Sequence, residues 1–157
     1  SAYLVFISET LLQSYGGLLR VFPCVPRGFT GAFQNFRAEG AFLVSAAMKK
    51  GRTRFIEVTS LAGGALRLRN PWPRRKVICL AGRRATSLPG EELLLEMRKG
   101  ETLFFCLHRR ALEERRRLIF KSEREASPKC IAFDDGSFAW LGKPAPSLYY
   151  AGMPPRE

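Results

Sequence analysis

The sequence predicts a mainly β protein, an antiparallel β-sandwich preceded by a short N-terminal helix. Two observations predict this class: short apolar runs recur at regular spacing along the chain, and turns rich in Gly and Pro separate them. A third is the clean alternation at residues 65–69, where Leu66 and Leu68 share one face and Arg67 and Arg69 share the other. A strand with one face on the core and one face in water has this period of two.

The N-terminal segment is predicted to be helical over residues 3–14, because its apolar residues recur at helical spacing and two glycines follow at Gly16 and Gly17. We assign residues 1–16 to this terminal helix and residues 17–157 to a β-sandwich domain. The sandwich is expected to end in an irregular proline-rich tail.

The remaining elements follow in order after a brief extended run at residues 18–22 and a loop at residues 27–37, which is rich in Gly and Phe. Lys50 and Gly51 join two strand-like runs and predict a hairpin, and Lys99 and Gly100 predict a second one. The motif Asn70-Pro71-Trp72-Pro73 is expected to interrupt a sheet, since proline cannot donate a ladder hydrogen bond. The predicted strands cover residues 41–49, 53–60, 65–69, 76–80, 91–97 and 101–107, with edge strands at 118–121 and 130–133.

Residues 109–117 interrupt this rhythm with a run of strong helix formers. Glu113 and Glu114 stand at the spacing that allows ion pairs along a helix with the arginines on either side. We expect a short solvent-facing helix here, or an extension of a strand.

Composition and length describe one folded domain: 157 residues, 46% hydrophobic and 25% charged. The first seven residues lack the basic start of a signal peptide, and the sequence has no apolar run of about 20 residues to span a membrane. The chain begins without Met inside an amphipathic segment, so we interpret it as a fragment. The location of its parent is left open between the cytoplasm and secretion.

The net charge of +12 favours acidic partners, but the basic residues are scattered over the sequence rather than gathered in one block. We interpret them mainly as the solvent faces of strands. The alternative function is a module that binds nucleic acid or another polyanion.

Residues with catalytic chemistry are few and have no supporting motif. His108 is the only histidine, and the sequence contains no glycine-rich phosphate loop. We therefore assign no catalytic residue and no cofactor. Five carboxylates lie outside the Arg- and Glu-rich segments, but each is typical of a cap, a turn or a solvated strand face: Glu9, Glu39, Glu57, Asp134 and Asp135.

The four cysteines, Cys24, Cys79, Cys106 and Cys130, are too far apart in the sequence for zinc-type spacing, so no metal site is predicted. We expect reduced and mostly buried thiols, with a disulfide left open.

Aromatic residues in loops are the candidates for contact with a sugar, because their rings can stack on it. The alternative is that a loop tryptophan plugs the structure, and a carbohydrate-binding module stays a second alternative function. The candidate sugar-contact residues are Trp72, Trp140, Tyr149 and Tyr150.

Three segments, taken together, resemble one protein family. Residues 11–26 read L-L-Q-S-Y-G-G-L-L-R-V-F-P-C-V-P, residues 36–44 read F-R-A-E-G-A-F-L-V, and residues 60–72 begin S-L-A-G-G and end R-N-P-W. They resemble the junction and first strands after the catalytic region of family 95 glycoside hydrolases, the α-L-fucosidases and their uncharacterised relatives. The resemblance covers residues 7–107.

The resemblance implies that the N-terminal helix is the last helix of an absent (α/α)₆ barrel, with Leu4, Ile7 and Leu11 packing against that barrel. The family's essential Asp, in a D-G-N-F-G-G segment, would fall before Ser1. The implied function is a non-catalytic C-terminal accessory domain of a bacterial glycoside hydrolase. Its implied partners are the helical barrel, carbohydrate, and a second copy through apolar surface that the barrel would cover, with no membrane partner.

This sequence also departs from the family. Ser8-Glu9-Thr10 stands where the fucosidases have A-E-M, and Tyr15-Gly16-Gly17 replaces a version led by histidine. The sugar specificity of the parent enzyme is therefore left open.

Overall fold

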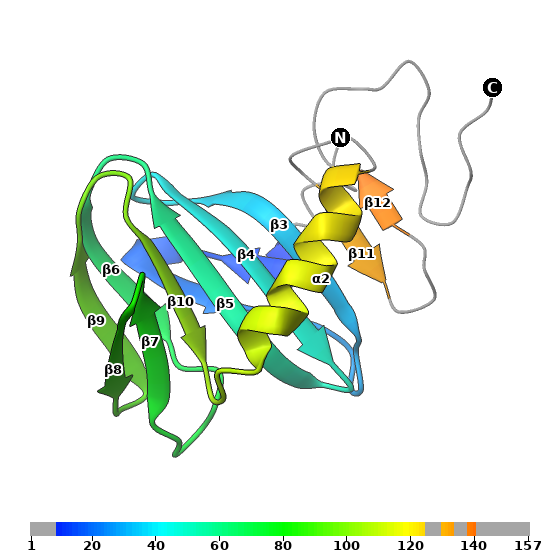
Figure 1. Cartoon of the computed structure of the whole chain (residues 1–157), viewed down its shortest axis with the longest axis horizontal. Coiled ribbons are helices and arrows are strands. Elements are labelled where there is room, and N and C mark those ends of the chain that lie inside the picture. The colour runs from blue at the N-terminus through cyan, green and yellow to red at the C-terminus, as the bar shows by residue number, and fades with distance from the viewer. Residues whose placement is uncertain (1–8, 125–129, 134–137, 141–157) are drawn as a thin grey trace.

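The protein is a β-sandwich of two packed sheets, seen in a computed structural model that describes residues 9–124, 130–133 and 138–140 (Figure 1). The smaller sheet has the strand order β1 (Leu12–Gln13), β2 (Leu18–Val21), β6 (Gly64–Arg69) and β9 (Glu92–Met97). The larger sheet has the order β12 (Phe138–Trp140), β11 (Cys130–Phe133), β3 (Gly31–Ala38), β4 (Phe42–Lys49), β5 (Arg52–Ser60), β10 (Thr102–Cys106), β7 (Val77–Ala81) and β8 (Arg84–Leu88). The predicted class is confirmed, with one parallel pair, β2 and β6, among antiparallel neighbours.

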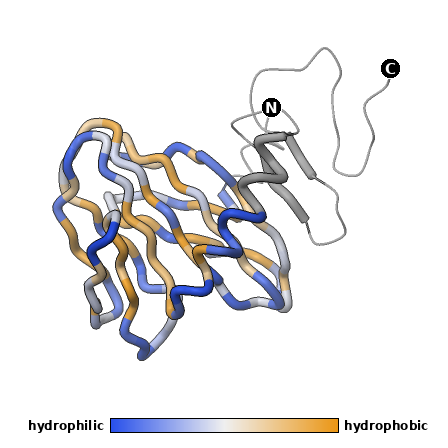
Figure 2. Tube along the Cα trace, viewed as in Figure 1, coloured by the Kyte–Doolittle hydropathy of each residue, from blue (hydrophilic) through white to orange (hydrophobic). Residues whose placement is uncertain are grey.

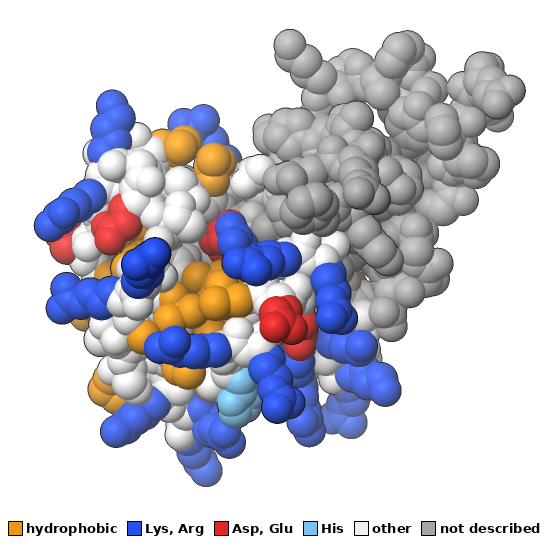
Figure 3. Space-filling model, viewed as in Figure 1, with side chains coloured by type: hydrophobic (Ala, Val, Ile, Leu, Met, Phe, Trp, Pro, Cys, Tyr) orange, Lys and Arg blue, Asp and Glu red, His pale blue; other side chains and the backbone are white. Residues whose placement is uncertain are grey.

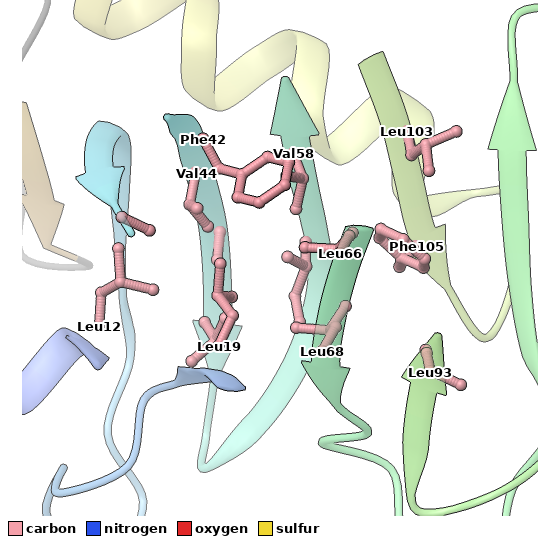
Figure 4. Close-up of a cluster of buried hydrophobic side chains, with 14 of the residues drawn as sticks. Leu12, Leu19, Phe42, Val44, Val58, Leu66, Leu68, Leu93, Leu103 and Phe105 are labelled. Carbon is pink, nitrogen blue, oxygen red and sulfur yellow. The ribbon is translucent and has the colours of Figure 1, made fainter. Parts of the chain in front are cut away.

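The core lies between the sheets and follows the period of two. Leu66 and Leu68 of β6 point from the small sheet toward Val58 of β5 and Phe105 of β10 (Figure 4). All four side chains are almost completely buried. Burying a side chain of this size stabilises the fold by about 1.5–3 kcal/mol relative to leaving it in water. The alternation at residues 65–69 was therefore interpreted correctly.

The hairpin between β4 and β5 is also confirmed. Its turn residues Lys50 and Gly51 both have positive φ, 49° and 72°, as a tight turn between right-twisted strands requires. Figure 2 shows that hydrophobic residues lie mainly in the strands of the sandwich and hydrophilic residues mainly in its turns.

The hairpin predicted at Lys99 and Gly100 is wrong. β9 pairs with β6, whereas β10 pairs with β5 and β7, so this turn carries the chain from one sheet to the other. The buried Ser60 holds the crossing, because its C=O accepts from the Gly100 N–H at 2.7 Å and its N–H donates to the Glu101 C=O at 2.9 Å. A turn motif marks a change of direction, but it does not identify the sheet that the next strand joins.

Besides the two-residue β1, three strands were not predicted: β3, β8 and β12. Residues 27–37 were predicted as a loop, but β3 occupies most of them, because a bulge between Phe33 and Phe36 shifts its alternation. β8 was not predicted, since its side chains are largely exposed and carry no apolar period. It forms as an edge strand because its backbone pairs with the free edge of β7.

The N-terminal helix ends earlier than predicted. Residues 9–11 are helical, but Leu12 and Gln13 form β1 and pair with Val21 and Arg20. Leu11, expected to pack against a barrel, is only 5% exposed and lies in the core of this sandwich. Leu12 and Gln13, which were assigned to the terminal helix, therefore belong to the small sheet, and the domain boundary at residue 16 stays a prediction. The other two expected barrel contacts, Leu4 and Ile7, lie outside the described residues.

The second helix, α2 (Ala111–Arg124), is longer than the predicted 109–117 and includes the run 118–121 that was predicted as an edge strand. It begins beside the end of β10 and crosses the outer face of the large sheet in front of β5 and β4 (Figure 1). Ala111 is buried there with Phe55 and Phe104 in a second, smaller apolar cluster. The helix therefore packs on the sheet with one face, rather than lying free in solvent.

Ion pairs join α2 to β5, in addition to the electrostatic effect of Arg117 on Glu114 along the helix. Glu114 accepts hydrogen bonds from the Arg54 guanidinium, with Nε at 2.8 Å, and Arg115 pairs with Glu57. Burial raises the pKa of Glu57 more than Arg115 lowers it. The hydrogen bond from Arg54 lowers the pKa of Glu114 below its ordinary 4.5.

Glu114→Gln is expected to destabilise the protein by about 0.2–1 kcal/mol at neutral pH, the range for a partly exposed pair. A carboxyl with a lowered folded pKa stabilises above its ordinary pKa, and this contribution is lost as pH falls through the folded value. The gap between wild type and Glu114→Gln in urea unfolding should therefore narrow as the pH is lowered from neutral to below the ordinary carboxyl pKa of 4.5. Glu57 titrates in both proteins and cancels in the difference. An unchanged gap at both pH values would contradict the role of the Arg54 pair.

Three of the cysteines have described side chains, and all three are free thiols. Cys79 and Cys106 are buried, as expected, but Cys24 is exposed. Burial raises the pKa of the Cys79 thiol to about 11, which keeps it protonated and unreactive. Cys130 lies on β11, and the predicted turn at residues 134–136 and the proline-rich tail lie outside the described residues.

Candidate functional site

The candidate site is an open groove of about 1400 Å³ at one end of the sandwich, which we call the basic groove. Three connections form it: the turn between β4 and β5, the loop between β6 and β7, and the segment that joins β10 to α2. Figure 3 shows Lys and Arg side chains gathered along this end of the molecule around the single histidine. The basic residues of the lining are Arg52, Arg54, Arg75, His108, Arg109 and Arg110.

Glu114 is the single carboxylate among the described lining residues, and it pairs with Arg54. In the part of the chain that the structure describes, no ion pair joins a carboxylate to any of the other four arginines of the groove. All four are exposed. The groove therefore presents an excess of positive charge to solvent.

Trp72 forms part of the wall of the basic groove, but only 7% of it is exposed. Its indole N–H donates to the Thr53 C=O at 2.8 Å, which ties the β6–β7 loop to β5. Little of the ring is left to stack on a sugar. The structure gives Trp72 the plug role that was the alternative interpretation of a loop tryptophan.

Asn70 fixes the same loop with three hydrogen bonds, all to backbone. Its side-chain amide donates to the C=O groups of Arg75 at 3.1 Å and Gly90 at 2.8 Å, and its Oδ1 accepts from the Trp72 N–H at 2.9 Å. Asn70 is itself buried. The N-P-W motif is thus a structural clamp that shapes one wall of the groove.

Trp140, the other candidate with a described backbone, lies away from this groove. Trp140 ends β12 at the edge of the large sheet, and β11, β3 and β4 separate that strand from β5. Tyr149 and Tyr150 lie outside the described residues. The structure therefore does not bring Trp72 and Trp140 together, and ligand contact by Trp140, Tyr149 and Tyr150 stays a prediction.

Among the carboxylates that were considered for catalysis, Glu9 and Glu39 both lie near Tyr15, whereas Glu57 lies on β5. Glu39 accepts from the Gly17 N–H at 3.2 Å, its own N–H donates to Ser14 Oγ at 3.0 Å, and Glu57 pairs with Arg115 under α2. Asp134 and Asp135 lie outside the described residues. Within the described ranges, no three His, Cys, Asp or Glu side chains are grouped as a metal ion would require.

Sequence reasoning missed the basic groove because its arginines come from three separate connections. Arg52 and Arg54 begin β5 just after a turn, Arg75 follows the N-P-W motif, and Arg109 and Arg110 precede a helix. In sequence, each of these three places looks like an ordinary solvated turn. The three groups of arginines can be placed at one end of the sandwich only when it is known where the chain passes from one sheet to the other.

Fold and site together define a two-sheet β-sandwich domain with a basic groove at one end. A comparison with known protein families and with curated proteins found no match to this chain. None of the helices in the described ranges has the length and apolar character needed to cross a membrane.

Proposed function

We propose that this chain is a non-catalytic accessory domain of a glycoside hydrolase similar to family 95, and that it packs against the enzyme's helical barrel. One observation supports the proposal: residues of the three segments that resemble family 95 hold the fold together by hydrogen bonds. Ser14, Gly17 and Glu39 join two of the resembling segments by hydrogen bonds. In the third segment, the side chains of Asn70 and Trp72 form hydrogen bonds with backbone groups. Residues used in this way build a scaffold rather than a reaction centre.

The end of the sandwich opposite the basic groove is the proposed contact with the barrel. Tyr15, 61% exposed, and Leu61, 36% exposed, both lie there, next to the connection between β3 and β4. The chain enters the sandwich at β1, directly after the helical residues 9–11, and reaches Tyr15 two residues after that strand. Exposed apolar side chains that follow the helical segment so closely in the chain favour contact with a preceding domain.

The extent of this apolar surface is smaller than the sequence led us to expect. Among the described residues, the large exposed hydrophobic side chains are Tyr15, Leu61 and Leu94. Leu94 lies on β9, at the edge of the small sheet. A contact built on two such side chains resembles the modest interfaces between domains of one chain.

Tyr15→Ser combined with Leu61→Ser, in the whole gene product, is expected to speed the thermal inactivation of glycosidase activity, because the barrel loses its apolar contact with the sandwich. Leu94→Ser is the matched control, since it removes one exposed apolar side chain away from the proposed contact. Inactivation half-lives at one temperature measure the effect. Equal half-lives for the double variant and the control would contradict the proposed contact.

The assignment as an accessory domain is tested by assaying this chain and the whole gene product side by side on a panel of nitrophenyl glycosides. We expect turnover from the whole product and none from this chain alone. The proposal fails if this chain turns over a glycoside and a single substitution within it abolishes that activity. It also fails if the gene encodes no helical region before Ser1.

A further inference from the structure

We propose that the basic groove binds an acidic oligosaccharide, a single glycan chain that carries carboxylate or sulfate groups. The choice of a glycan rests on the proposed association with a glycoside hydrolase, whereas the choice of an anion rests on the groove itself. Five arginines from three connections converge on this one depression, against the single carboxylate of Glu114. Convergence from separate parts of the chain distinguishes this groove from the scattered charge elsewhere.

The backbone that carries these arginines is held in place. At the β4–β5 turn, the Gly51 N–H donates to the Phe29 C=O at 2.8 Å, and a Cβ at Gly51 would lie 3.2 Å from the Gly28 nitrogen. At the start of α2, the Ala111 N–H donates to the His108 C=O at 3.0 Å and the Leu112 N–H to the Arg109 C=O at 3.1 Å. The Asn70 clamp holds the third connection. A preformed site loses less entropy when an anion binds.

Arginine is suited to this ligand. Its planar guanidinium presents parallel N–H donors that match the two oxygens of a carboxylate or sulfate. Arg54 already shows this pairing within the protein, since two of its nitrogens bind the two carboxylate oxygens of Glu114. Arg109 and Arg110 are exposed at the mouth of the same groove and can bind a ligand carboxylate in the same way.

The aromatic residues of the groove favour a glycan over nucleic acid. Proteins that bind single strands stack bases on exposed aromatic rings. The two aromatic residues that line this groove, Phe22 and Trp72, are 6% and 7% exposed. They therefore provide no stacking platform, while Pro71 and Pro73 offer small apolar surfaces to the C–H faces of a sugar.

The test is calorimetric titration of the full chain, at low ionic strength, with hexagalacturonate and with a heparin hexasaccharide, which separate the carboxylate source from the sulfate source. Maltohexaose is the neutral control ligand, and an oligothymidylate of equal charge is the nucleic-acid control. We expect binding of at least one acidic glycan, weaker binding of the oligothymidylate, and none of maltohexaose. Stronger binding of the oligothymidylate, or no binding of either acidic glycan, would overturn the proposal.

Arg109→Ser with Arg110→Ser is the diagnostic variant, and Arg83→Ser with Arg84→Ser is the matched control. The control removes the same charge from an exposed turn between β7 and β8, at the other end of β7 from the groove. We expect the groove variant to lose about tenfold or more in affinity for the glycan, and the control less than about twofold. Equal losses in both would show attraction by net charge alone and would overturn the site. Circular dichroism checks that both variants are folded.

This outcome is independent of the test of the accessory role. If the groove fails to bind but the whole gene product hydrolyses glycosides, the accessory domain stands without this site. If the groove binds an acidic glycan but the gene encodes no helical region before Ser1, the chain is a glycan-binding module and the enzyme association is wrong.

Discussion

Trp72→Ala is expected to lower the free energy of unfolding by about 3–5 kcal/mol, the cost of removing a large buried aromatic side chain. The substitution empties a site that is 93% covered, since only 7% of Trp72 is exposed, and it leaves the Thr53 C=O without its indole donor. The loop between β6 and β7 would lose its attachment to β5. Urea unfolding followed by circular dichroism measures the change.

Trp72→Phe is the matched control, because it keeps an apolar ring but removes the N–H. Its cost should be smaller, about 1–3 kcal/mol for the unsatisfied carbonyl. A different outcome would restore the sugar-contact interpretation: Trp72→Ala unfolding at the wild-type urea midpoint while losing affinity for a glycan. The comparison therefore separates a structural plug from a stacking platform.

Asn70→Ala is expected to cost about 3 kcal/mol, since three backbone groups each lose a partner worth about 1 kcal/mol. These are the C=O groups of Arg75 and Gly90 and the N–H of Trp72. Because Arg75 lines the basic groove, the same variant should also weaken binding of an anionic ligand. Urea unfolding and the calorimetric titration measure the two effects.

Thr86→Ala is the control for Asn70→Ala, since Thr86 is an exposed residue of the edge strand β8. Its effect should lie within about 0.5 kcal/mol, as for most surface substitutions. If Asn70→Ala matched that small value, the clamp would not be important for the stability of the loop. The prediction therefore depends on the hydrogen bonds rather than on burial alone.

The sequence did not predict the basic groove, although several of its residues were considered one by one. Arg109 and Arg110 were interpreted as part of a solvated helix, and Trp72 as a candidate sugar contact or a plug. In the fold, Arg109 and Arg110 precede the helix and border the groove, and Trp72 supports its wall. A binding surface made from three connections depends on which ends of which strands meet, and no local pattern records that.

The sequence by itself determined the class of fold, most of the strands and the hairpin at Lys50 and Gly51. These features depend on local chemistry: the alternation of Leu66 and Leu68 with arginine, and the positive φ that the tight turn needs. Residues within a few positions of one another are enough to express them, because side chains of a strand alternate whatever its partner is.

Only the tertiary structure decided which sheet each strand joins, where the N-terminal helix gives way to β1, and that an edge strand forms at β8. The apolar faces of both sheets look the same in sequence, since both are buried in one shared core. A side chain such as Phe105 would be buried in that core whichever sheet its strand joined. The choice between them follows from the pairing of distant strands and the packing of the whole core, and it is this choice that brings the arginines of the basic groove together.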